Sequence, residues 1–185
     1  MFKFQLSFEG TPEWEDFPIG EDEIAKLVKK IISKERLHTK PQEMIEYIIK
    51  NREHINTVLS AQGLGIQERC KLVGDIAIGH GVVKKGCENV TRETSFASKF
   101  CSYFNWDFPK YDSLTRVFLN FPAIKEITGI TVKEHDYQSF IEALVKLKQH
   151  LVEQGSLEEA KTLEELDTAI YRYMKFDDNQ KNPTG

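Results

Sequence analysis

The chain has 185 residues, of which 40% are hydrophobic and 29% charged, and its mean hydropathy is −0.44. These values are typical of a globular protein with one hydrophobic core, and no apolar run approaches the ~20 residues of a membrane-spanning helix. The net charge of −4 argues against a general nucleic-acid binder. Residues 84–125, however, carry seven basic and four acidic side chains, and such a local excess permits a phosphate-binding face.

The cysteines and the N-terminal sequence predict a cytoplasmic protein. Cys70, Cys87 and Cys101 are odd in number and not closely paired, so reduced thiols are the simplest interpretation. The first residues alternate in polarity and lack the apolar segment of a secretory signal. Neither the cysteines nor the five histidines have the spacing of a metal site, and no dinucleotide or Walker loop is present. The sequence therefore predicts no metal and no cofactor.

The hydrophobic pattern predicts a mostly α protein. Alternation over residues 2–8 predicts a short N-terminal strand, and the Gly- and Pro-containing residues 9–20 predict a loop. Apolar residues then recur at helical spacing, with caps at Pro41, Asp112, Asp136 and Thr162. They predict seven or eight helices, including 21–34, 41–59, 67–78, 90–105, 113–120, 136–151 and 162–174. Pro122 and Gly129 bound a connection between two of them.

These elements predict one compact helical domain over residues 1–176. Residues 177–185 are polar, and we expect them to form a disordered tail.

The most informative segment is Ser95-Phe96-Ala97-Ser98-Lys99-Phe100-Cys101-Ser102-Tyr103-Phe104-Asn105, followed by Phe108-Pro109-Lys110-Tyr111-Asp112-Ser113-Leu114-Thr115-Arg116-Val117-Phe118. It predicts a helix, a Pro-containing turn and a second helix that begins after Asp112. Phe96, Phe100 and Phe104 recur every four residues and face the core, whereas Lys99 lies on or near the opposite face. Asp112 is placed to cap the second helix, which holds its carboxylate rigid and ionised. We expect Lys99 and Asp112 to meet in one cleft.

This segment resembles the helix-hairpin-helix DNA glycosylases, and most closely the compact bacterial proteins with the 8-oxoguanine DNA glycosylase fold. In those proteins a "TKF" or "SKF" helix start is followed by an aspartate that opens the next helix. The resemblance covers about residues 91–118, with a weaker likeness in the spacing of the helices over 137–175. It implies base excision from DNA, a hydrolase activity with or without AP lyase activity.

The resemblance also implies a role for individual residues. Lys99 would be the nucleophile that attacks the sugar C1′, and Asp112 the carboxylate that stabilises the positive charge developing on the sugar. An enzyme of this kind binds DNA and everts the target nucleotide. The candidate DNA- or substrate-binding residues are Arg92, Lys110, Arg116, Tyr103 and Trp106.

Several alternatives stay open at this point. Ile78-Gly79-His80-Gly81-Val82 resembles a Gly-x-Gly hairpin, and in that register Lys84 or Lys85 would be the nucleophile. Thr91-Arg92-Glu93-Thr94 stands where the family has Leu-Pro-Gly-Val-Gly, which favours a non-catalytic relative that binds nucleic acid or protein. The aromatic residues near Lys99 form either a wall for an everted base or part of the core. The chain could also be a helical protein–protein module, and the sequence gives no oligomeric state.

Overall fold

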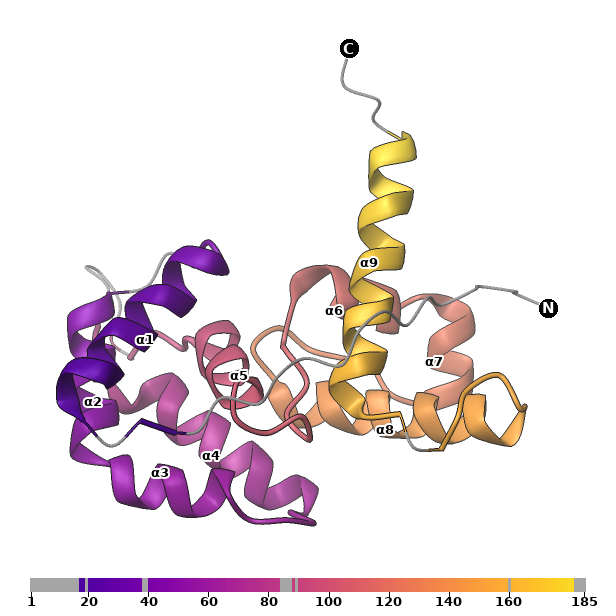
Figure 1. The fold of residues 1–185 in the computed structure, drawn as a ribbon. Coiled ribbons are helices and arrows are strands. Elements are labelled where there is room, and N and C mark those ends of the chain that lie inside the picture. Colours follow the sequence, from indigo (N-terminus) through magenta and orange to yellow (C-terminus); the bar gives the residue numbers. More distant parts are fainter. Residues whose placement is uncertain are drawn as a thin grey trace.

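Nine helices form along the residues that the computed structural model describes, which are 17–18, 20–37, 40–83, 88, 90–159 and 161–181. They are α1 (Glu21–Lys34), α2 (Pro41–Lys50), α3 (Arg52–Leu59), α4 (Ile66–Gly79), α5 (Thr94–Ser102), α6 (Ser113–Leu119), α7 (Pro122–Thr128), α8 (Tyr137–Glu153) and α9 (Leu163–Lys181). The predicted single, mostly helical domain is confirmed (Figure 1). The strand predicted over residues 2–8 lies outside the described residues.

Local signals place several helix ends where the sequence predicts them. Helix α1 has the predicted bounds, with three acidic residues in its first turn and Lys34 in its last. Asp112 caps α6, because its Oδ1 accepts the Leu114 backbone N–H at 2.7 Å. Asp136 caps α8 in the same way, and Thr162 and Glu165 form the predicted capping box of α9.

The helix predicted over residues 41–59 is divided into two helices, because the helical backbone is interrupted at Asn51. The Asn51 side-chain amide donates to the Tyr47 carbonyl at 2.8 Å, and the Asn51 backbone leaves helical geometry at φ −110° and ψ 12°. Such a local side-chain hydrogen bond competes with the helical ladder. The periodicity of apolar residues continues across the break, so the pattern alone predicts one helix.

Two other predictions need correction. The helix predicted over residues 90–105 spans only Thr94–Ser102. It begins later than predicted because Val90 pairs with Val83 in a β-bridge and the Thr91 N–H donates to the Val82 carbonyl. The connection predicted between Pro122 and Gly129 is helix α7, with Pro122 in its first turn and Gly129 ending it at φ +67°.

The predicted polar tail is helical where it begins. Helix α9 continues from Leu163 to Lys181, so residues 177–181 extend the helix instead of leaving it at Asp177. Residues 182–185 lie outside the described part.

The helices form two groups that meet along α4, α5 and α8. Figure 1 shows α1–α5 on one side and α6–α9 on the other, with α9 rising above the rest. Helix α4 packs against both α5 and α8, and α6 packs against α9. Helix α5 is almost entirely buried, including Phe96 and Phe100 at 0% exposure, so it forms the centre of the core. In the described part of the chain, no helix combines the length and apolar character needed to cross a bilayer.

Candidate functional site

A cavity of about 540 Å³ opens between the two helix groups. Its walls come from the C-terminal end of α1, from α5, from the turn before α6 and from α9. The volume falls within the ~300–1,000 Å³ of typical small-ligand sites. The lining residues are Lys34, Glu35, Arg36, Lys99, Lys110, Asp112, Asp167, Thr168, Tyr171, Arg172 and Lys175.

Lys99 and Asp112 both line this cavity, as the sequence predicts. Lys99 is 7% exposed, and its Nζ lies 4.0 Å from Asp112 Oδ2. Glu35 lies closer, with its Oε2 3.3 Å from the same Nζ. A nearly buried ammonium group requires such compensation, because removing a lone charge from water is costly. The amine is therefore held between two carboxylates at the cavity wall.

The turn that carries Asp112 is fixed by three helices. The Tyr137 hydroxyl of α8 donates to the Pro109 carbonyl at 3.0 Å, and the Lys110 backbone N–H donates to Asp167 Oδ2 of α9 at 3.0 Å. The Tyr111 backbone N–H donates to the Ser98 hydroxyl of α5 at 2.9 Å. Because Ser98 precedes Lys99 and Tyr111 precedes Asp112, this last bond joins the two halves of the predicted pair.

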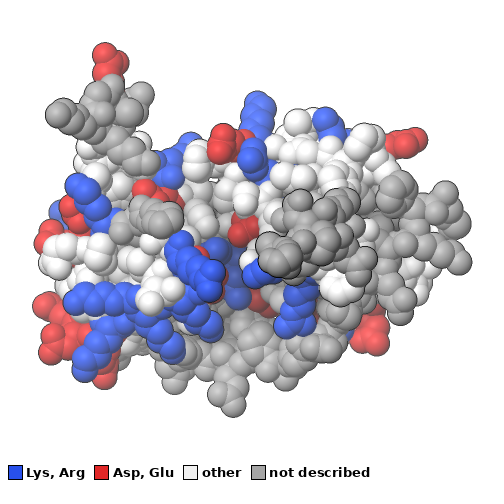
Figure 2. Space-filling model, turned by 90° about the horizontal axis from the view of Figure 1, so that it is seen from above, with Lys and Arg blue, Asp and Glu red and all other residues white. Residues whose placement is uncertain are grey.

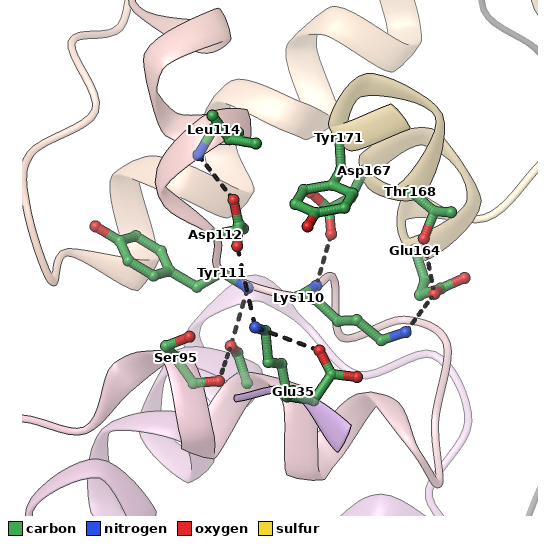
Figure 3. A network of polar contacts seen from close by, with 12 residues as sticks. Glu35, Ser95, Lys110, Tyr111, Asp112, Leu114, Glu164, Asp167, Thr168 and Tyr171 are labelled. Carbon is green, nitrogen blue, oxygen red and sulfur yellow. Dashed lines mark hydrogen bonds and ion pairs between the residues drawn. The ribbon is translucent and has the colours of Figure 1, made fainter. Parts of the chain in front are cut away.

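Figure 3 shows how these groups converge, with Glu35 below, Asp112 above it and Lys110 reaching from the turn toward Glu164. Lys110 Nζ lies 3.1 Å from Glu164 Oε1. Burial opposes the charge on Lys110, but the neighbouring carboxylates of Glu164, Glu35 and Asp167 raise its pKa on balance. The Lys110 side chain therefore ties the turn to α9, in addition to its backbone bond with Asp167.

Asp167, which accepts the Lys110 backbone N–H, is a carboxyl group that is almost fully buried. It is 2% exposed, and burial raises its pKa to about 8. The hydroxyl of Thr115 lowers the pKa, the charges of Glu164 and Asp112 raise it, and the charge of Lys110 lowers it. Asp167 is therefore mostly protonated at neutral pH, which reduces the negative charge at the cavity.

The other predicted binding residues are divided between this cavity and its surroundings. Lys110 lines it, but Tyr103 and Trp106 do not. Tyr103 is half-buried, with Lys34 Nζ 5.4 Å from its ring centre, and Trp106 is also half-buried. Arg116 is half-buried on α6, outside the cavity lining. The aromatic side chain that lines the cavity is Tyr171, on α9.

Arg92 is exposed and lines a second cavity of about 360 Å³, which it shares with Lys133 and His135. It is therefore separate from Lys99. The alternative nucleophiles, Lys84 and Lys85, lie outside the described residues. Within those residues, no group of three or more His, Cys, Asp or Glu side chains is arranged to hold a metal ion.

Sequence reasoning missed the contributions of α1 and α9. Glu35 follows an ordinary amphipathic helix, and Asp167 and Tyr171 lie on another, so neither segment has a motif that marks it. One weak signal was available. Asp167 falls among the apolar residues Leu163, Leu166 and Ile170 of its helix, on a face where a carboxylate needs a partner.

The cavity is basic although the whole chain is acidic. Its lining holds six Lys or Arg residues against three Asp or Glu residues. Figure 2, which views the molecule from above, shows basic side chains gathered in the middle and left of this face. A positive, partly enclosed surface of this kind attracts anionic ligands such as phosphate groups.

The fold and site together define a mostly helical protein with a buried lysine at the wall of a basic cavity. Scans against protein-family models, curated proteins and solved structures found no match to the chain.

Proposed function

We propose that the protein is a DNA glycosylase with AP lyase activity, acting on a modified or damaged base through Lys99. The observation that carries this proposal is the position of Lys99 Nζ, 4.0 Å from Asp112 Oδ2 and at the wall of a basic cavity. The resemblance of Ser98-Lys99-Phe100 and Asp112 to the catalytic segment of the helix-hairpin-helix glycosylases supports it.

The chemistry follows from the two groups. Departure of a base leaves a positively charged sugar, which a fixed carboxylate stabilises electrostatically. Asp112 is suited to this role because its Oδ1 is bound by the Leu114 N–H while its Oδ2 faces Lys99. The neutral Lys99 amine attacks C1′, after passing its proton to one of the adjacent carboxylates, and a covalent intermediate forms.

The rest of the cavity supports a nucleotide as the ligand. Tyr171 offers an aromatic side chain against which a base can stack. Lys34, Arg36, Arg172 and Lys175 offer positive charge for the phosphates on either side of it.

Borohydride trapping on DNA that contains an abasic site tests the proposal. The wild-type protein should form a covalent complex, and Lys99→Ala should form none. Release of the base from a panel of lesion-containing duplexes then identifies the substrate. If wild type traps no better than Lys99→Ala, the lyase activity is refuted.

The second candidate is a non-catalytic nucleic-acid-binding relative of the same fold. It is favoured by the pairing of Lys99 with two carboxylates, which is also what a purely structural lysine needs. Binding of DNA that survives Asp112→Asn, with no base release from any lesion, would support it over the enzyme.

A further inference from the structure

Glu35 is the closest charged partner of Lys99, yet the proposed glycosylase chemistry gives it no role. Its Oε2 lies 3.3 Å from Lys99 Nζ, compared with 4.0 Å for Asp112 Oδ2. In the described part of the chain, Glu35 pairs with Lys99, and its charge also helps to raise the pKa of Lys110. Its side chain is 19% exposed and lines the cavity, so it is open to a bound ligand.

The backbone holds Glu35 at this place at some cost. Glu35 is the C-cap residue of α1, and Arg36 follows in the left-handed region at φ 52°, which favours glycine. The Leu37 N–H closes the turn by donating to the Ile32 carbonyl at 2.9 Å. This turn closes the helix and fixes Glu35 at the cavity wall.

The two carboxylates differ in their suitability as bases. Asp112 Oδ1 accepts the Leu114 N–H, so one of its two carboxylate oxygens is already engaged by the backbone. No backbone N–H in the described part of the chain holds Glu35. Asp112 is thus suited to stabilise charge, and Glu35 is suited to accept a proton.

Geometry then points to the proton that Glu35 can reach. Once Lys99 Nζ is bonded to C1′, the next sugar atom is C2′, which lies two bonds from Nζ. A carboxylate oxygen 3.3 Å from Nζ is close enough to approach a C2′ hydrogen when C2′ lies on the Glu35 side of Nζ.

We infer that Glu35 is the base of the lyase step and removes a C2′ proton from the Lys99-linked sugar. This inference rests on the proposed function. Before this step the C1′–O4′ bond breaks, O4′ keeps the electron pair and takes up a proton that Nζ loses, and Nζ forms an iminium with C1′. Glu35 then takes the C2′ proton, the C2′–H electron pair forms a C1′=C2′ double bond, and the π electrons of the iminium move to Nζ. When the iminium re-forms, the C2′=C3′ double bond forms and the C3′–O bond breaks. The 3′ phosphate leaves with that electron pair. The substrate class is a deoxyribose abasic site, whose C2′ carries the required hydrogens.

Single-turnover reactions on a duplex with a preformed abasic site test the inference, with two readouts. Borohydride trapping measures the covalent intermediate, and strand cleavage measures the elimination. Glu35→Gln should still trap, but its cleavage rate should fall by about 100-fold or more, the usual effect of losing a general base. Glu35→Asp should recover part of that rate. Glu46→Gln, an exposed position on α2, is the matched control and should behave as wild type in both assays.

The outcomes separate this inference from the proposed function. Cleavage by Glu35→Gln at the wild-type rate would overturn the role of Glu35 while leaving Lys99 as the nucleophile. A parallel loss of trapping and cleavage would also overturn it, because Glu35 would then only position the amine. If wild type neither traps nor cleaves, the proposed function fails, and the inference fails with it. Thermal unfolding of each variant checks that the fold is intact, and Asp112 still compensates Lys99 in Glu35→Gln.

Discussion

At the scale of single residues, the site is a set of charges that depend on one another. Lys99 is compensated by Glu35 and Asp112, and Lys110 by Glu164. The sequence predicted Lys99 and Asp112 because both lie in one short segment, and it predicted the cap made by Asp112. Glu35 could not be predicted, because only the packing of α1 against α5 brings it beside Lys99.

Asp167 makes stability depend on pH in a definite direction. Its pKa in the folded protein is about 8, well above the ordinary 3.8, so the folded state binds its proton more tightly than the unfolded state. The contribution of Asp167 to the free energy of unfolding therefore falls as pH rises from about 4 toward 8, and it stays constant at higher pH. Asp167→Asn keeps an acceptor for the Lys110 N–H but cannot ionise. It should be as stable as wild type near pH 4 and more stable at pH 9.

Urea unfolding of both proteins at pH 4, 7 and 9 measures this effect. A constant difference between the two across that range would show that Asp167 ionises in its ordinary range.

At the scale of helices and turns, the end of α1 places a charged residue at the cavity in a backbone conformation that favours glycine. Arg36 occupies a left-handed position that closes the helix, and it also lines the cavity. Arg36→Gly should increase the free energy of unfolding by about 1 kcal/mol, because glycine adopts this conformation without the clash of a Cβ atom. It should also weaken DNA binding, because it removes a positive charge.

The control for this prediction is Arg36→Ala, which removes the charge but keeps the backbone strain. Urea unfolding should show a gain for glycine and none for alanine. Equal stability of the two variants would mean that the turn is not strained.

Helix positions follow from the sequence only where a local signal decides them. The acidic first turn of α1, the caps of α6 and α8 and the capping box of α9 are local, and each was predicted. The break at Asn51 was not, because a side-chain amide overrides an unbroken apolar pattern. The start of α5 was also missed, because a β-bridge between Val83 and Val90 keeps the preceding residues out of the helix.

At the scale of the whole molecule, an acidic chain concentrates basic residues around one cavity. The net charge is −4, yet six of the lining residues are Lys or Arg. DNA binding should therefore weaken steeply with salt, because each phosphate contact releases a counterion. Arg172→Gln should lower the slope of log K against log salt by about 0.9 if Arg172 contacts one phosphate.

Fluorescence anisotropy on a labelled duplex measures these slopes. The salt concentration is varied from about 50 to 200 mM, where the affinity of proteins with several phosphate contacts changes strongly. Lys146→Gln, an exposed position on α8 outside the cavity lining, should retain the wild-type slope. The same slope for Arg172→Gln and wild type would place the DNA elsewhere on the surface.

The hydrogen bond between the Tyr111 N–H and the Ser98 hydroxyl has a consequence for comparing this chain with others. It joins the two ends of the intervening stretch, and with the bonds from Tyr137 and Asp167 it holds the Lys99 amine near the Asp112 carboxylate although the two residues lie far apart in the sequence. Distant relatives are therefore better sought by the serine–lysine pair, whose hydroxyl accepts this bond, than by the residue before the aspartate, whose backbone N–H any residue except proline provides.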